Sequence, residues 1–106
     1  MNNDKALSLL GLAKKAGKLK SGEYCVEEEL KKGRAKLVIV ANDASDNTKK
    51  KFTDKSSFKK VPLCFYSDKA GLGKSTGNEE RAVLVIIDEN FAKAINEEIL
   101  KRNNQN

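Results

Sequence analysis

The chain has 106 residues, of which 39% are hydrophobic and 34% are charged. This length suits a single domain, 1–106, and the composition is too apolar for a disordered chain. No run approaches the roughly 18 apolar residues that a membrane span needs, and nothing at the N-terminus reads as a secretion signal. We therefore expect one domain, with no membrane partner, in the cytoplasm.

The charge is distributed unevenly. The chain carries +6 overall, yet residues 1–74 hold 17 Lys/Arg against 9 Asp/Glu, whereas residues 75–106 hold 4 against 6. A basic majority indicates a polyanionic partner, with nucleic acid as the first candidate and an anionic membrane surface as the second. A solvated lysine-rich surface is the alternative interpretation.

Chemistry-bearing residues are few. Cys25 and Cys64 lie 39 positions apart, which fits neither a disulfide framework nor a zinc site, and the chain has no histidine. We expect two free thiols. Because metal-ligand spacing and a nucleophile–base pair are also missing, the sequence assigns no catalytic residue, no metal and no cofactor, and we expect a protein that is not an enzyme.

The first half of the chain predicts helices alternating with strands. Apolar residues at helical spacing indicate a helix over residues 4–16. Residues 18–20 alternate as a very short strand, and a second helix is predicted over 22–32. The run KLVIVA at 36–41 is almost continuously apolar, which is typical of a strand covered on both faces.

The second half continues the alternation. A mostly polar helix is predicted over 46–57, and the strand over 61–66 carries Pro62, which lacks an N–H donor and favours an edge position. A short helix then leads to the most hydrophobic strand, 82–87, and to a last helix, and residues 103–106 are expected to fray. This order predicts an α/β fold: a three-layer α/β/α sandwich with a mixed four-stranded sheet and an ordered core over about 5–100.

The stretch GLGKST at 71–76, followed by VLVIID at 83–88, resembles the two halves of a nucleotide-triphosphate site. A phosphate loop needs G-x-x-x-x-G-K-[ST] directly after a strand, with glycine at both ends so that backbone N–H groups point at the phosphate. The position of the first glycine is Asp68, an anion. We therefore interpret the stretch as a short helix followed by a central strand.

The pattern most typical of a binding site surrounds the start of the second predicted helix. A helix N-terminus offers unpaired N–H groups and a partial positive charge, which suit a phosphate, and Tyr24 adds a flat ring that can stack on a base. A half-buried tyrosine among solubilising lysines is the alternative. The candidate residues here are Lys15, Lys18, Lys20, Ser21, Gly22 and Tyr24, with Lys32 at the other end of the helix.

A second basic run covers Lys49–Lys51 with Lys55, Lys59 and Lys60. Helical spacing spreads these lysines around the helix, so we interpret the run as a solvated outer face.

At this point the residues resemble a family. The segment GEYCVEEELKKGRAKLV at 22–38 resembles the signature helix and strand of the kink-turn-binding ribosomal proteins, of the archaeal L-seven-Ae and eukaryotic L-thirty-e type. Leu72-Gly73-Lys74 with Gly77 resembles that family's short helix before the last strand. The stretches ALSLLGLAKKAGKLKSGE and DASDNTKKKFTDK are similar to its bacterial ylxQ-like branch, and the resemblance covers about residues 5–96.

The resemblance implies an α/β/α sandwich that binds a sharply kinked, structured RNA, with ribosomal RNA as the expected partner and ribosomal proteins as further partners. In the family the start of the second helix contacts tandem sheared G·A pairs, and the loop before the last strand covers an extruded base. Those positions correspond here to 22–28 and 77–81.

Three positions of the signature helix depart from the family pattern. Kink-turn binders show Gly-Ala-Asn-Glu-x-x-Lys, whereas this chain has Tyr24, Cys25 and Glu28 in place of the Asn, Glu and Lys. A thiol is a weak acceptor, and an anion replaces a cation, so the usual base readout does not carry over. Recognition by shape and charge remains, and a protein-interaction module of the translation machinery that has lost kink-turn recognition is the alternative.

The sequence thus predicts a monomeric, ribosome-associated RNA-binding protein. Its candidate RNA-contacting residues are Lys15, Lys18, Lys20, Ser21, Gly22, Glu23, Tyr24, Cys25, Glu28, Lys32, Gly77, Asn78, Glu79, Glu80 and Arg81.

Overall fold

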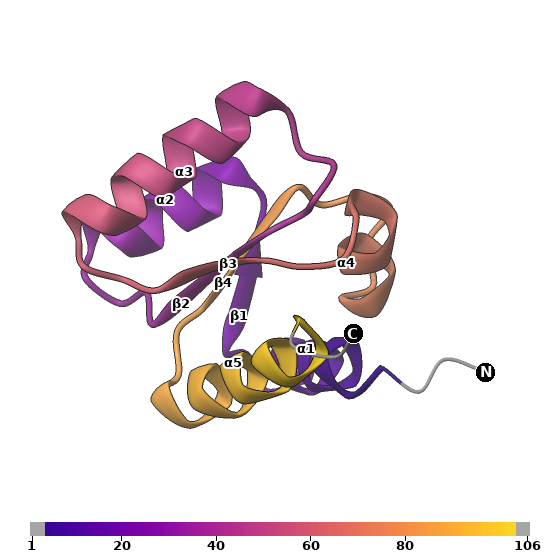
Figure 1. The fold of residues 1–106 in the computed structure, drawn as a ribbon. Coiled ribbons are helices and arrows are strands. Elements are labelled where there is room, and N and C mark those ends of the chain that lie inside the picture. The colour runs from indigo at the N-terminus through magenta and orange to yellow at the C-terminus, as the bar shows by residue number, and fades with distance from the viewer. Residues whose placement is uncertain (1–3, 104–106) are drawn as a thin grey trace.

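The protein is described by a computed structural model covering residues 4–103. Over this range helices and strands alternate as predicted (Figure 1). In chain order the elements are α1 (Lys5–Lys15), β1 (Leu19–Ser21), α2 (Glu23–Lys31), β2 (Leu37–Val40), α3 (Asp46–Phe58), β3 (Leu63–Phe65), α4 (Lys69–Ser75), β4 (Val83–Ile86) and α5 (Glu89–Asn103).

The four strands form one mixed sheet in the order β1-β4-β2-β3. β4 lies in the middle and pairs antiparallel with both β1 and β2, whereas β2 and β3 are parallel. Ser21 is opposite Leu84, so the end of β1 lies beside the start of β4. β3 occupies an edge, as Pro62 predicted.

Helices cover both faces of the sheet. α2 and α3 lie side by side on one face, α1 and α5 lie on the other, and α4 stands at one end (Figure 1). This is the predicted three-layer α/β/α sandwich. Among the helices of the described range, none is long and apolar enough to cross a membrane.

The core sits where the two central strands meet the helices. Every residue of β2 and of β4 is buried, which explains their near-continuous apolar sequences. Phe52 is fully buried and anchors the otherwise polar α3. Four helix starts are fixed by side-chain oxygens that accept first-turn N–H groups; these belong to Asp4, Ser45, Asp68 and Asp88.

Several predicted boundaries were wrong by one or two residues. β1 begins at Leu19 and not at Lys18. β3 covers only residues 63–65, because Pro62 has no N–H and the Val61 N–H donates to the Ser56 carbonyl at the end of α3. α5 continues through Asn103, where fraying was expected, and residues 104–106 lie outside the described range.

Candidate nucleic-acid interface

The start of α2 is an open helix end. Gly22 precedes the helix with φ 94°, a backbone conformation that side-chain-bearing residues rarely adopt, and its N–H donates to the Val83 carbonyl at 3.0 Å. Within residues 4–103, no side chain caps this end. The first-turn N–H groups, which have no acceptor within the helix, are therefore available to an acceptor such as a phosphate.

The loop before β4 lies directly beside this helix start. The Arg81 side chain joins the two: its Nε donates to Ser21 Oγ at 3.0 Å, and its Nη2 donates to Asn78 Oδ1 at 3.1 Å. Its Nη1 also donates to the Glu80 carbonyl at 2.8 Å. The structure thus brings Ser21, Gly22 and the loop 77–81 together in one surface.

α4 holds this loop in place. The Asn78 N–H donates to the Gly73 carbonyl at 2.8 Å, and Asn78 Nδ2 donates to the Thr76 carbonyl at 3.2 Å. A Cβ on Gly73 would lie only 2.2 Å from the Glu79 carbonyl oxygen, so glycine permits this close approach. GLGKST is therefore helical, with Asp68 as its cap, and its second glycine packs against the loop. It does not form a phosphate cradle.

Tyr24 and Cys25 project from the first turn of α2. Tyr24 is 75% exposed, and Cys25 is exposed as well. An exposed ring at a helix start can stack on an unpaired base. Both cysteines are free thiols, and burial raises the pKa of the other one, Cys64, to about 12.

Two carboxylates of α2 turn toward α3. Glu23 accepts from Thr48 Oγ1 at 3.1 Å and from Lys51 Nζ at 3.3 Å, and Glu27 pairs with the same lysine. The Lys51 hydrogen bond lowers the pKa of Glu27, and the Glu27 carboxylate in turn raises the pKa of Lys51. These acids are therefore compensated by α3.

Glu29 is also compensated. It is only 5% exposed and accepts two parallel hydrogen bonds from Arg34, from Nε at 2.7 Å and from Nη2 at 2.8 Å. The Arg34 hydrogen bonds hold the pKa of Glu29 below its usual value. Glu28 differs, since it is half-buried and lies 3.9 Å from Lys31.

The structure does not gather the candidate lysines at the helix start. Lys20 is exposed on the edge strand β1, but Lys18 lies at the other end of that strand, where its carbonyl accepts from the Ile87 N–H. At about 3.3 Å per residue, Lys18 is roughly 13 Å along the chain from Gly22. Lys32 follows the far end of α2 from Gly22. Lys15 is the last residue of α1.

The loop itself carries two exposed acids, Glu79 and Glu80, next to Arg81. Neither forms an ion pair within residues 4–103. A phosphate backbone is therefore expected to approach from the lysine-bearing β1 edge, while the loop offers backbone and Asn78 groups.

The sequence named Ser21, Glu23 and Arg81 as candidates, but it did not predict the contacts that tie the surface together. The contact between Glu23 and Thr48 spans 25 positions, and that between Arg81 and Ser21 spans 60. Local periodicity carries no signal for such contacts. The approach of Gly73 to the loop has a weak signal, an unexplained glycine inside a short helix.

This arrangement is that of a known class of protein. The model of the Ribosomal protein L7Ae/L30e/S12e/Gadd45 family matches residues 4–96, and the chain belongs to this family. It is similar to the RNA-binding protein YlxQ of Bacillus subtilis, at 47% identity over 82% of this chain and 87% of the relative. The YlxQ protein of Enterococcus faecium is 45% identical over 91% and 92% of the two chains.

Further relatives and solved structures share this similarity in sequence or fold. The large ribosomal subunit protein eL8 of Thermoplasma volcanium is 33% identical over 93% of this chain and 79% of its own. A solved protein of unknown function from Bacillus halodurans superposes with a TM-score of 0.88 at 36% identity, covering 92% and 98% of the chains. The Giardia lamblia 15.5kD RNA binding protein, at 23% identity and a TM-score of 0.75 over 95% and 90%, shares the fold.

Proposed function

We propose that this protein binds structured, kink-turn-like RNA through the start of α2 and the loop 77–81. The observation that carries the proposal is the Arg81–Ser21 hydrogen bond, which joins these two segments into one surface beside the exposed Tyr24. Family membership and relatives named RNA-binding proteins support it.

The proposed mode of recognition relies on shape, stacking and phosphate contacts. Gly22 allows the RNA to approach the helix start closely, and Tyr24 stacks on an unpaired base. Lys20 on β1 and Lys18 just before it contact phosphates. Base-edge readout has a smaller part, because Cys25 and Glu28 stand where kink-turn binders carry Glu and Lys.

The expected setting is a monomer that associates with ribosomal RNA in the cytoplasm and has no catalytic activity. The family's ribosomal members support this setting.

A binding assay tests the proposal. Fluorescence anisotropy compares a kink-turn RNA with a matched duplex in which Watson–Crick pairs replace the tandem G·A pairs. Tyr24→Ala is expected to weaken binding of the kinked RNA by about 1–3 kcal/mol if the ring stacks on a base. Phe58→Ala, which removes another exposed ring at the far end of α3, serves as the matched control and is expected to leave this affinity unchanged.

Salt dependence gives a second readout. If Lys15, Lys18 and Lys20 each contact one phosphate, the affinity is expected to fall about 4- to 6-fold for each doubling of salt. Equal affinity for kinked and straight RNA, or a flat salt response, contradicts the proposal.

The alternative is a protein-interaction module that no longer recognises kink-turns. The departures at Tyr24, Cys25 and Glu28 favour it. This alternative predicts that the protein binds no RNA and that its contact with a ribosomal protein survives nuclease treatment.

A further inference from the structure

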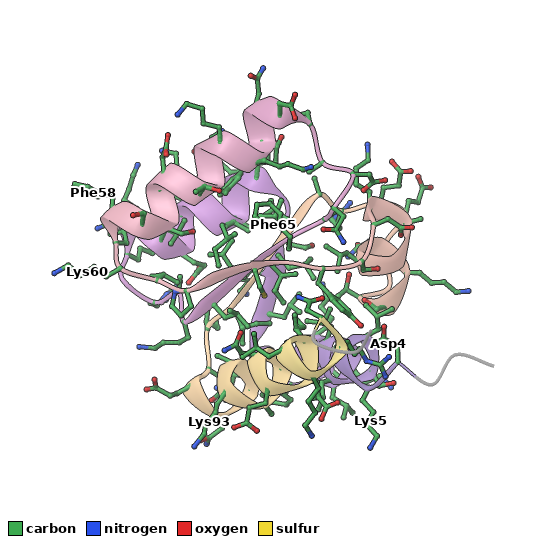
Figure 2. The ribbon with its side chains drawn as sticks, viewed as in Figure 1. Asp4, Lys5, Phe58, Lys60, Phe65 and Lys93 are labelled. Carbon is green, nitrogen blue, oxygen red and sulfur yellow. The ribbon has the colours of Figure 1, made fainter. Side chains whose placement is uncertain are left out.

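A second surface lies at the other end of the α2–α3 layer. The C-terminal ends of these two helices enclose an open groove of about 560 Å³. The groove is separate from the candidate RNA surface, because Gly22 and Lys31 stand at opposite ends of α2, about 13 Å apart at 1.5 Å per residue. Figure 2 shows Phe58 and Lys60 at the edge of the molecule farthest from α4.

An exposed aromatic side chain marks this groove. Phe58, the last residue of α3, is 83% exposed, more than any other large hydrophobic side chain that the structure describes. Leu30, which is buried, lines the groove with it and makes the floor apolar. An aromatic ring held in water beside an apolar hollow is typical of an anchor point in a protein interface.

The charged side chains that line the groove and are not held in a close ion pair are positive. Its two carboxylates are already paired, Glu27 with Lys51 and Asp54 with Lys50, the latter at 3.2 Å. Within residues 4–103, Lys55 and Lys59 form no ion pair. The remaining lining lysine, Lys31, is only loosely held, at 3.9 Å from Glu28. The cations therefore remain available to an acidic partner.

We propose that this groove docks an acidic protein segment, which inserts one large apolar side chain between Leu30 and Phe58. Its carboxylates pair with Lys31, Lys55 and Lys59 at the rim. This site goes beyond the proposed RNA binding and allows one molecule to hold RNA at one end and a protein at the other.

The groove suits a peptide better than an RNA strand. The carboxylates of Glu27 and Asp54 stand in its walls, where regularly spaced phosphates would meet them, whereas a peptide can place its few acids over the lysines. The second basic run, interpreted from sequence as a solvated face, thus supplies two of the rim cations, Lys55 and Lys59.

Labelled peptides of about 12 residues test the proposal by fluorescence anisotropy with the full chain. One series carries a single Phe or Leu among Asp and Glu residues; a second replaces these acids with Lys, and a third replaces the apolar anchor with Ala. We expect the acidic, anchored series to bind at least about tenfold more tightly than either of the others.

Variants locate the binding. Phe58→Ala and the double variant Lys55→Glu/Lys59→Glu are each expected to weaken binding of the acidic, anchored peptides about tenfold or more. The matched control, Lys5→Glu/Lys93→Glu, makes the same charge change on α1 and α5, the opposite helical layer (Figure 2), and is expected to leave that affinity within about twofold. Because Phe58 is exposed, its variant is expected to retain the wild-type melting temperature, which verifies folding.

Three results overturn the proposal. The first is equal binding of the acidic, basic and anchor-free peptides, or none. The second is an equal loss in the control variant, which would indicate general charge attraction. The third is that Phe58→Ala weakens the binding of a single-stranded RNA but leaves peptide binding unchanged, which would assign the groove to nucleic acid.

Discussion

Replacing Gly73 with alanine isolates the contact that positions the loop before β4. The added Cβ would lie 2.2 Å from the Glu79 carbonyl oxygen, 2.6 Å from its carbon and 2.8 Å from the Glu80 Cα. All three atoms belong to the backbone and cannot rotate away, so the loop must retreat by about 1 Å to reach ordinary contact.

The expected cost follows from two opposing effects. Overpacking of this kind costs about 1–3 kcal/mol, and the better helix propensity of alanine offsets up to about 1 kcal/mol. A net loss of about 1–2 kcal/mol corresponds to a melting temperature lower by about 5–15 °C in a domain of this size. Because the retreating loop carries Asn78 and Arg81, we expect kink-turn RNA affinity to fall about tenfold or more.

Gly71→Ala is the matched control. It makes the same change in the same helix, but the nearest atom, at 2.3 Å, is Ser67 Oγ, the end of a side chain that can rotate. We expect a stability change within about 0.5 kcal/mol and unchanged RNA affinity. Thermal melts by circular dichroism and anisotropy titrations measure both. If Gly73→Ala melts and binds like Gly71→Ala, the loop is not held by this contact and the reasoning fails.

Three further predictions concern hydrogen-bonded side chains. Arg81→Met removes the hydrogen bonds to Ser21, Asn78 and the Glu80 carbonyl, and it is expected to weaken kink-turn RNA binding about tenfold by anisotropy while changing urea stability by less than about 1 kcal/mol. An unchanged affinity would show that these bonds have no part in binding. Glu29 has a lowered pKa in the fold, so its contribution to stability is present above its usual pKa of 4.5 and is lost as pH falls through the folded value. In urea unfolding, the free energy of unfolding of Glu29→Gln is therefore expected to decline less than that of the wild type between about pH 5 and 3. Parallel curves would contradict this. Tyr66→Phe removes the hydroxyl that donates to Asp4 at 2.6 Å, so we expect a loss of about 1.5–3 kcal/mol near neutral pH. Burial and the Asp4 carboxylate raise the pKa of Tyr66, so wild-type stability is expected to fall above about pH 10 while the variant lacks this decline; equal stabilities at pH 7 would show that the bond contributes nothing.

The sequence predicted the elements well where the signal was local. The continuous apolar run at 36–41 indicated a buried strand, and Pro62 indicated an edge, since both properties depend on a few neighbouring residues.

The candidate surface was harder to predict. That Ser21 and Arg81 meet depends on the pairing of the first strand with the last, which no local pattern encodes. The lysines were expected to crowd around the helix start, although the four-residue separation of Lys18 and Gly22 in extended chain already implied a distance of roughly 13 Å. Grouping residues by sequence proximity ignored the length of a strand.

The position of β4 has a consequence for biosynthesis. β1 and β2 do not pair with each other, since the last strand in the sequence inserts between them and supplies the partner that each needs on that side. During translation, the first two strands therefore remain without this shared neighbour until residues 83–86 have left the ribosome. We expect the nascent chain to acquire protease resistance in one cooperative step, after residues 83–86 have emerged.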